Sequence, residues 1–487
     1  MTPRIRRVFH RAALVAVAAL IARGGVVTAG DSGDRRPMNV LFLAVDDLRP
    51  QLGCYGQTQM ITPNIDALAA QGMLFHRAYC QSAICGPSRA SLLTGLRPDT
   101  SGIIRNRPSV SQAVPDILTL PRQFKSHGYH TVSIGKIYHG PGDDKGGWSE
   151  RPVRPRGGYN LPANQAIMVA YARGLAEGKD PPRGPVVEAA DVPDEGYSDG
   201  VVANLAIEAL RKIKDKPFFL ATGFSKPHMP FACPRKYWDM YPEESIRLAD
   251  NPLLPDGAPE IAPYNWDEMR AYNDIDDDGS LTDEKRRQLI RGYCACVSYA
   301  DAQVGKVVAE LDRLDLRENT IVILWGDHGW HLGENGQWGK HTNYEQATRA
   351  PLILSVPGMK NVGQSTDALV EFVDIYPTLS ELCNQPLPDH LEGRSFSALL
   401  EDPNLAWKTA AFSQVLRWDR GMGYTMRTEK YRYARWQDPR GNIVGHEIYD
   451  HVDDPQENTN LANRPESAQL LQQLDQQLNA GWREALP

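Results

Sequence analysis

Apolar segments recur along the first three quarters of the chain and are separated by helix-like stretches. The apolar runs lie at 38–45, 129–135, 217–223, 319–329 and 350–358. Continuous runs of this kind are typical of parallel strands that are buried on both faces. Helical patterns occupy 63–71, 117–127, 201–213 and 284–315. We therefore predict an α/β fold, with a large, mostly parallel sheet covered by helices on both faces.

The pattern changes after about residue 400. Short runs such as AFSQVLRW, GYTMRT, KYRYARW and HEIYD alternate with turn-like residues, and a helical pattern follows near 466–483. This predicts a smaller antiparallel sheet with a terminal helix, so we divide the chain into a main domain, 30–399, and a C-terminal subdomain, 400–487. Segments 140–200 and 232–284 are rich in Pro, Gly and Asp, and we expect long loops there.

The first 29 residues differ from the rest of the chain. Arginines precede the apolar run AALVAVAALIA, and small residues around Ala29 suit a cleavage site. We interpret 1–29 as a secretory signal. The alternative is a membrane anchor, but the run has 11 residues, whereas a spanning helix needs about 20. We expect a secreted or periplasmic protein with no membrane anchor after cleavage.

Composition limits the classes of function. The chain has 487 residues, 41% of them hydrophobic, and a net charge of -7, which fits a globular protein and argues against nucleic-acid binding. Its seven cysteines form no Cys-x-x-Cys pair, and one stays unpaired if the others bridge. Cys85 is the best candidate for that one, since Pro87, Ser88 and Arg89 follow it at the start of a helical pattern.

Two pairs of candidate metal ligands come at the ends of predicted strands. Asp46-Asp47 ends the first apolar run, and Asp327-His328 follows IVILWG in the same manner. Either pair alone is most simply a solvated turn. Strand ends of a parallel sheet converge, however, and adjacent carboxylates are costly unless a cation compensates them. Together the pairs indicate a hard divalent ion, Ca²⁺ or else Mg²⁺ or Mn²⁺.

Basic groups are placed to hold an anion near the same strand ends. Each alone is more simply a surface or core residue, but three of the four groups follow predicted strands. A cation together with basic side chains suits a tetrahedral oxyanion. The groups are Arg89, Lys136 with His139, Lys226 with His228, and Lys340 with His341.

An acidic run at 274–285, DIDDDGSLTDEK, has the spacing of an EF-hand loop at its first six positions. Position twelve, where a bidentate Glu is needed, is Lys285. We therefore expect a solvated acidic turn that caps the next helix.

The run Cys85-Gly86-Pro87-Ser88-Arg89, continued by Leu-Thr-Gly, resembles the signature of formylglycine-dependent sulfatases of the alkaline phosphatase superfamily. NVLFLAVDDLRPQLGCYG, GKIYH, KPHMPF, GDHGWHLGENGQWGKH and GYTMRTEKYRY resemble the iduronate-2-sulfatase-like branch, in the same order. The resemblance implies that Cys85 becomes formylglycine and helps to bind Ca²⁺. It assigns metal binding to Asp46, Asp47, Cys85, Asp327 and His328, and catalysis to Cys85, Arg89, Lys136, His139, His228 and Lys340.

The implied reaction is hydrolysis of sulfate esters on sugars, foremost the 2-O-sulfate of iduronate or a related uronic acid in a sulfated polysaccharide. The implied partners are this substrate and an enzyme that generates formylglycine. We assign His228 to protonation of the leaving alcohol and His139 to sulfate release. Lys226, Trp330 and His341 are candidates for binding the uronate carboxylate, and packing is an equally good interpretation of each.

Three alternatives stay open. The substrate can be an algal polysaccharide instead of a glycosaminoglycan. The enzyme can also be a phosphonate or phosphate ester hydrolase of the same superfamily. The third reading, a glycan-binding protein on a disabled sulfatase scaffold, is disfavoured because every nominated catalytic position is filled.

Overall fold

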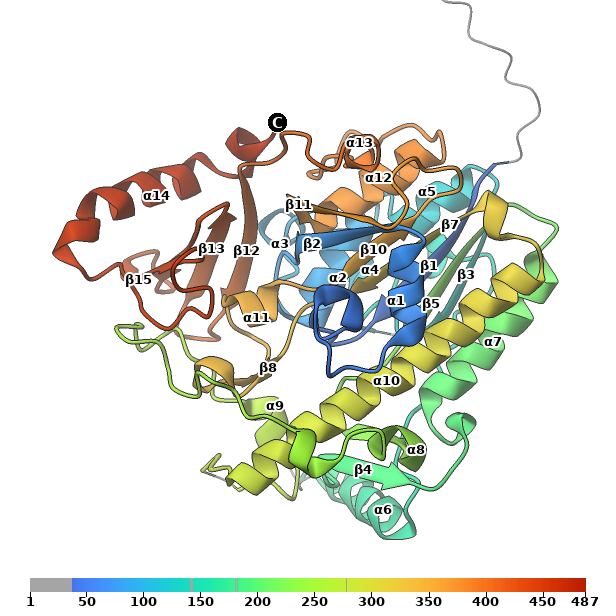
Figure 1. Cartoon of the computed structure of the whole chain (residues 1–487), viewed down its shortest axis with the longest axis horizontal. Helices are drawn as coiled ribbons and strands as arrows, with labels where there is room; N and C mark the ends of the chain where they lie inside the picture. The colour runs from blue at the N-terminus through green and yellow to red at the C-terminus, as the bar shows by residue number, and fades with distance from the viewer. Residues whose placement is uncertain (1–36, 141–142, 180, 182, 277) are drawn as a thin grey trace, which may run out of the picture. The chain divides into compact units, whose positions relative to one another are not determined.

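A seven-stranded sheet organises the chain from Pro37 onward (Figure 1). The computed structural model describes residues 37–140, 143–179, 181, 183–276 and 278–487. The predicted signal at 1–29 lies outside them. In spatial order the strands are β11 (Gln364–Glu371), β2 (Met73–Tyr79), β10 (Leu352–Ser355), β7 (Thr320–Gly326), β1 (Asn39–Val45), β5 (Phe218–Phe224) and β3 (His130–Gly135).

The sheet is parallel except at β10, which runs antiparallel to both of its neighbours, β2 and β7. The central strands are in register at their carboxyl ends. Val45 of β1 pairs with Gly326 of β7 and with Phe224 of β5, so the three strands end at one level. Every residue of these strands is buried, which explains their continuous apolar sequences.

The two faces of the sheet bury alternate residues of β1. Leu41, Leu43 and Val45 belong to a core that includes α1 (Pro63–Ala70), α7 (Ser198–Ile213) and α10 (Asp283–Arg313). Val40, Phe42 and Ala44 face the other core, with α2 (Cys85–Thr94), α5 (Leu120–Ser126) and α12 (Ile375–Leu382). The predicted α/β architecture with helices on both faces is therefore confirmed.

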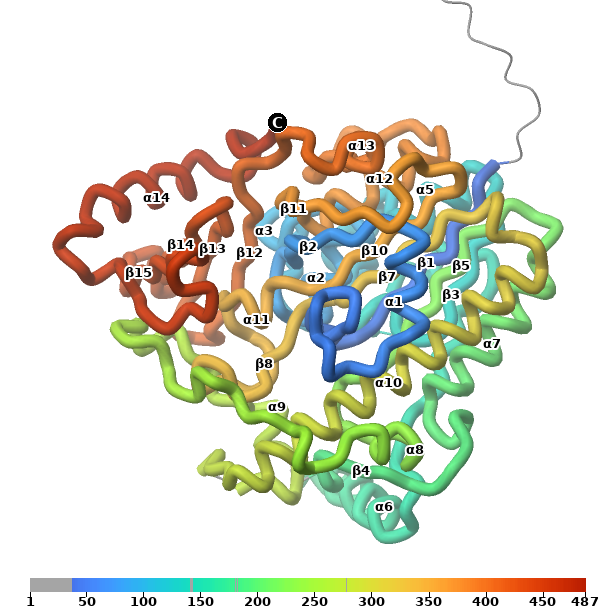
Figure 2. The backbone as a smooth tube through the Cα atoms, in the orientation of Figure 1, coloured from blue at the N-terminus to red at the C-terminus, as the bar shows by residue number. Residues whose placement is uncertain are grey.

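A second, antiparallel sheet follows in the C-terminal part of the chain, as predicted. Its strands lie in sequence order, β12 (Ala410–Leu416), β13 (Met422–Thr428), β14 (Tyr431–Gln437) and β15 (Ile443–Asp450). Helix α14 (Ala468–Ala480) packs Leu474 and Leu478 against this sheet. Figure 2 follows the backbone from α13 (Ser397–Glu401) into β12, which contacts β2 and β11 of the large sheet. The division at 399/400 stays a prediction.

The structure also departs from the predicted elements. The segment 140–200, expected to be loop, contains helix α6 (Pro162–Ala176) and the short strand β4 (Val187–Ala190). Strands β2 and β11 were not predicted. The remaining elements are short: α3 (Pro98–Ser101), α4 (Val110–Ala113), β6 (Phe231–Pro234), α8 (Arg235–Trp238), α9 (Asp267–Arg270), β8 (His331–Leu332), β9 (Trp338–Gly339) and α11 (Glu345–Thr348).

The acidic run at 274–285 forms a cap and an ion pair. Thr282 caps α10 by accepting a hydrogen bond from the Lys285 backbone N–H. The ammonium of Lys285 lies 2.8 Å from Asp274 Oδ2, so the cation at position twelve pairs with the carboxylate at position one. Among the described residues, no helix is long and apolar enough to cross a membrane.

Candidate active site

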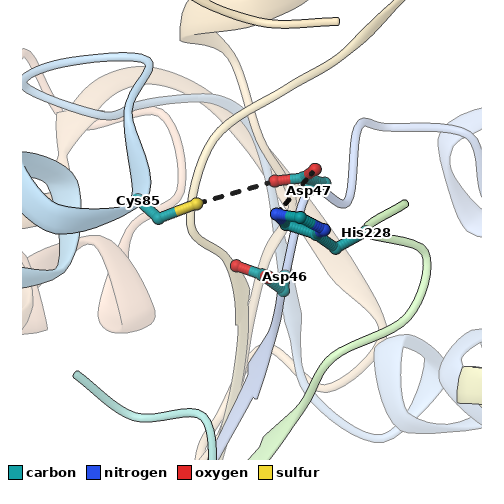
Figure 3. Close-up of side chains that lie close together, drawn as sticks. All are labelled: Asp46, Asp47, Cys85 and His228. Carbon is teal, nitrogen blue, oxygen red and sulfur yellow. Dashed lines mark hydrogen bonds and ion pairs between the residues drawn. The ribbon is translucent and has the colours of Figure 1, made fainter. Parts of the chain in front are cut away.

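Four adjacent strands deliver polar side chains to one edge of the large sheet. Because β7, β1, β5 and β3 are parallel neighbours, their carboxyl ends meet there. Figure 3 shows the side chains that approach one another from β1, from the loop after β5 and from the start of α2. The residues that follow these strands are Asp327 and His328 (β7), Asp46 and Asp47 (β1), Lys226 and His228 (β5), and Lys136 and His139 (β3).

Cys85 is the first residue of α2 and lies at the centre of this cluster. Its Sγ is 3.3 Å from His328 Nε2, 3.8 Å from Asp47 Oδ1, 3.6 Å from Lys340 Nζ and 3.7 Å from Lys136 Nζ. The side chain is buried, with 2% exposure. Burial, together with the charge of Asp46, raises the pKa of the Cys85 thiol well above its usual value. The unmodified thiol is therefore a poor nucleophile.

The residues after Cys85 attach α2 to the strand ends. The Ser88 hydroxyl donates to the Asp327 carbonyl. Arg89 is fully buried and pairs with Asp46 Oδ1 at 2.9 Å and with Asp327 Oδ2 at 2.8 Å. At Gly86, an added Cβ would lie 2.7 Å from Asn106 Cα, so any side chain there would push α2 away from its neighbour. The Gly-Pro-Ser-Arg sequence thus fixes the position of Cys85.

The acidic residues form a compact donor set. Ligand atoms of Asp47, Cys85, Asp327 and His328 all lie within 4.8 Å of one another. His328 Nδ1 donates to the Gly329 carbonyl at 2.9 Å, which leaves its Nε2 lone pair facing the cluster. Buried carboxylate oxygens with one imidazole fit a hard divalent ion.

Asp47 is held in a backbone conformation that non-glycine residues seldom adopt, with φ of 58°. Its N–H donates to Asp327 Oδ1 at 2.9 Å, and its carbonyl accepts from the Tyr293 hydroxyl at 2.8 Å. These two hydrogen bonds stabilise the turn that points Asp46 and Asp47 to the same centre.

Lysines and an arginine neutralise the carboxylates. Lys136 Nζ contacts Asp46 Oδ2, and Lys340 Nζ lies 2.8 and 3.0 Å from the two oxygens of Asp47. Burial acts to raise the pKa of Asp46, but Lys136 and Arg89 lower it by more, so the pKa of this carboxyl is held well below its usual range. Lys340 also lies 5.1 Å from the centre of the Trp330 ring, which supports it from behind.

His228 lies between the acidic cluster and a residue that sequence reasoning missed. Its Nε2 is 3.1 Å from Glu268 Oε1, and its Nδ1 is 2.7 Å from the Met229 carbonyl oxygen. Each ring nitrogen therefore faces a hydrogen-bond acceptor. Glu268, on α9, also lies 3.2 Å from Lys340 Nζ. No local motif marks Glu268 in the sequence.

His139 lies beside Lys136 but differs from His228. Burial, with the charge of Lys136, lowers the pKa of His139 to about 3, so its ring is neutral at pH 7. Its buried Nδ1 has no hydrogen-bond partner among the described residues. Its carbonyl accepts from Arg154 Nη1 at 2.7 Å. Among the described residues, Cys85 Sγ contacts Asp47, His328, Lys136 and Lys340, but not His139.

A cavity of about 510 Å³ opens from the cluster. Asp46, Lys136 and His228 line one part of it, and Lys226 lines it as well. The Lys226 ammonium donates to the carbonyls of His228 and Pro230, at 3.1 and 2.5 Å. It therefore holds the loop that carries His228.

The two other residues nominated for carboxylate binding pack against neighbouring side chains of the site. Trp330 is fully buried beneath Lys340, and the His341 ring stacks on Tyr264 with centroids 4.7 Å apart. Neither of them is among the described residues that line the cavity.

Family models identify the class of protein that this fold and site define. A model described as sulfatase matches residues 38–385, and one described as the C-terminal part of N-sulphoglucosamine sulphohydrolase matches residues 333–484. The chain belongs to the sulfatase family and is a sulfuric ester hydrolase.

Among characterised relatives, iduronate 2-sulfatases are the most informative. The protein of Homo sapiens is 33% identical over 557 residues, covering 97% of this chain and 99% of that protein. The protein of Mus musculus is 34% identical over 520 residues, covering 90% and 93%. An ulvan-active sulfatase of Formosa agariphila is 28% identical over 488 residues, covering 96% and 85%.

Solved structures share the fold. Phosphonate monoester hydrolase of Agrobacterium radiobacter aligns with a TM-score of 0.75 at 23% identity, covering 93% of this chain and 96% of that one. A 2-O GAG sulfatase aligns with a TM-score of 0.72 at 22% identity, covering 92% and 93%. At this level of identity the likeness establishes the architecture alone.

Proposed function

We propose that this sulfatase removes 2-O-sulfate groups from iduronate or a related uronic acid of a glycosaminoglycan, using a formylglycine at position 85 and Ca²⁺. The observation that carries the proposal is the setting of Cys85, which is buried among three carboxylates and two lysines at the strand ends. The likeness to iduronate 2-sulfatases over nearly the whole chain supports the choice of sugar.

Calcium fits the donors that the chain offers. Asp46, Asp47, Asp327 and His328, with residue 85, would hold the ion, since carboxylate oxygens dominate the set. When bound, the ion would supply positive charge to the sulfuryl oxygens. Lys136 and Lys340 would supply positive charge to the same oxygens whichever divalent ion is bound.

The modification of Cys85 answers a chemical need. Its buried thiol has a raised pKa, and a thiolate attacking a sulfate ester would leave no easy route to release the sulfate. A hydrated aldehyde at this position would supply one hydroxyl to attack sulfur and a second whose deprotonation expels sulfate, which splits one difficult step into two.

The surrounding side chains would act on charge and protons. Lys136 and Lys340, both within 3.7 Å of Cys85 Sγ, would balance charge on the sulfuryl oxygens, and Arg89 would hold residue 85 and the carboxylates in place. His228, whose two ring nitrogens face acceptors, would protonate the leaving sugar oxygen. His139, with a neutral ring, would assist release of sulfate.

Sulfate release from a panel of defined sugars tests the proposal. The protein is first examined by mass spectrometry to establish that residue 85 is formylglycine. We expect the highest kcat/KM on a non-reducing-end 2-O-sulfated uronic acid. A preference for sulfated algal sugars would replace the glycosaminoglycan substrate, and the ulvan-active relative is the observation that favours that second candidate.

The same panel separates the remaining alternatives. Faster turnover of phosphonate or phosphate esters than of sulfate esters would indicate that the enzyme is a phosphonate or phosphate ester hydrolase. Tight binding of sulfated sugars without release of sulfate by fully modified protein would indicate a glycan-binding role. Export, proposed from the first 29 residues, is tested by following the cleaved protein into the periplasm or medium of a host cell.

A further inference from the structure

The cavity beside the catalytic cluster carries positive charge that the sulfate does not use. Besides Lys136 and Lys226, it is lined by Arg154 and Arg183. We propose that Arg154, aided by Arg183, binds a second anionic group of the substrate, carried by the sugar that bears the scissile sulfate or by its neighbour. This inference rests on the proposed function and adds residues that discriminate among sulfated sugars.

The two arginines have no compensating carboxylate. Within the described part of the chain, neither Arg154 nor Arg183 forms an ion pair. Glu268, whose charge reaches Arg183, is itself paired with His228 and Lys340. Cations that line a cavity without an anionic partner are costly, and a ligand anion relieves that cost.

Arg154 is held in place from one side only. Its Nη1 donates to the His139 carbonyl at 2.7 Å, and this is the one hydrogen bond that the structure gives its guanidinium among the described residues. A guanidinium has five N–H donors in a planar fork, which matches a carboxylate or sulfate. Burial and the charge of Arg89 lower the pKa of Arg154, consistent with excess positive charge at this end of the cavity.

The rest of the cavity suits a sugar. Tyr159 and Tyr272 line it, and the Arg183 guanidinium lies 5.6 Å from the centre of the Tyr272 ring. A volume of about 510 Å³ falls within the range of small-molecule sites. Aromatic rings with fixed cations are suited to a sugar ring that carries negative groups, and a neutral sugar would leave the arginines uncompensated.

A matched set of substrates and variants tests the proposal. The substrates are a 2-O-sulfated uronic acid, its carboxyl-reduced twin, whose one negative charge is the scissile sulfate, and a carboxyl-reduced sugar that carries a second sulfate in place of the carboxylate. The variants are Arg154→Gln and Arg154→Lys. Arg151→Gln is the control, because Arg151 is exposed and belongs to the same segment.

The readout is the ratio of kcat/KM on each doubly charged sugar to that on the singly charged, carboxyl-reduced twin. We expect Arg154→Gln to lower this ratio by about 10-fold to 100-fold, since a charge-assisted hydrogen bond is lost. We expect Arg154→Lys to restore part of it and Arg151→Gln to leave it unchanged. The carboxylate and the second sulfate are compared to show which anion Arg154 prefers.

Two outcomes would overturn the inference. Equal losses on doubly and singly charged sugars would mean that Arg154 acts only by holding His139, and unchanged kcat/KM on all of them would mean that it contacts no anion. If the wild-type enzyme cleaves none of the sugars, the proposed function fails on its own. The same sugars then serve as competitors of aryl sulfate hydrolysis, and the ratio of their inhibition constants tests Arg154 in place of turnover.

Discussion

Glu268 Oε1 lies 3.1 Å from His228 Nε2, although the two residues come from segments far apart in the sequence. The carboxylate accepts from the imidazole and orients it toward the acidic cluster, where His228 Nε2 is 4.0 Å from Asp47 Oδ2. Glu268 is therefore a positioning residue for the group that we assign to protonation of the leaving alcohol.

Replacement of Glu268 by Gln should weaken that protonation. We expect kcat on an unactivated sugar sulfate to fall by about 10-fold or more, since general acid catalysis contributes about 10²-fold to 10⁴-fold. Aryl sulfates should lose less, because a phenolate leaves without help. Steady-state kinetics on both substrates measure this difference, and Glu260→Gln, at an exposed position, is the control. Equal losses on both substrates would contradict the assignment.

Arg89→Lys should destabilise the fold as well as the site. The Arg89 guanidinium is fully buried and bridges Asp46 and Asp327, and a lysine lacks the planar fork that makes both contacts. Breaking such a buried network costs about 3–5 kcal/mol, which chemical denaturation would reveal as a lower free energy of unfolding. Arg211→Ala removes the Arg211–Glu310 pair, in which the arginine is 54% exposed, and should change stability little. Comparable losses in the two variants would contradict this account.

Chelation of the divalent ion should abolish activity and lower the thermal stability of the enzyme. If Asp47 and Asp327 hold Ca²⁺, the calcium-bound enzyme gains about 2.7 kcal/mol at a calcium concentration about 100 times Kd. Thermal unfolding with EGTA and after calcium is restored measures the gain, and Asp47→Asn should abolish it. Full activity and an unchanged Tm after exhaustive chelation would contradict the calcium site.

Acid should weaken the attachment of the C-terminal sheet, because Glu371 Oε1 accepts a hydrogen bond from the Phe412 backbone N–H of β12 at 2.9 Å. Burial acts to raise the pKa of Glu371, but Arg97 and Lys408 lower it by more, to about 2. The pKa of an unfolded glutamate is about 4.3. Because the folded value is depressed, the stabilisation is complete above about pH 5 and is lost as pH falls toward about 2.

The variant Glu371→Gln should therefore be less stable than wild type at pH 7, by about 3 kcal/mol, and the two should converge on acidification. Free energies of unfolding between pH 7 and pH 3 provide the measurement. Glu466→Gln, at an exposed position, is the control. A difference that stays constant with pH would show that the ionised carboxylate of Glu371 is not the stabilising group.

The central strands and the residues after them could be predicted because their sequences are locally unambiguous. Strand β1 is apolar throughout and ends at Asp46, and β7 likewise ends at Asp327. Strand β2 escaped prediction because His76 and Arg77 interrupt its apolar run at positions that are only partly buried. In α6 only Gly174 is fully buried, and the exposed Val169 and Leu175 place apolar residues on the solvent side as well, so the amphipathic pattern of this surface helix is weak.

Glu268 and Arg154 could not be predicted from local pattern. They belong to segments whose path over the strand ends is set by distant contacts. Val153, for example, forms an isolated bridge with Ile134 of β3, and this contact brings Arg154 beside the cavity. No periodicity or motif within 140–200 encodes that pairing.

The burial of α2 has a consequence for how the enzyme is made. All 10 of its residues, Cys85 to Thr94, are buried once the sheet and its helices have assembled. If residue 85 becomes formylglycine, the enzyme that oxidises Cys85 must therefore bind this segment before the chain has folded. A chain that folds before this oxidation keeps Cys85 as a buried thiol and is a stable but inactive protein. The yield of active enzyme then depends on the rate of Cys85 oxidation relative to the rate of folding during biosynthesis.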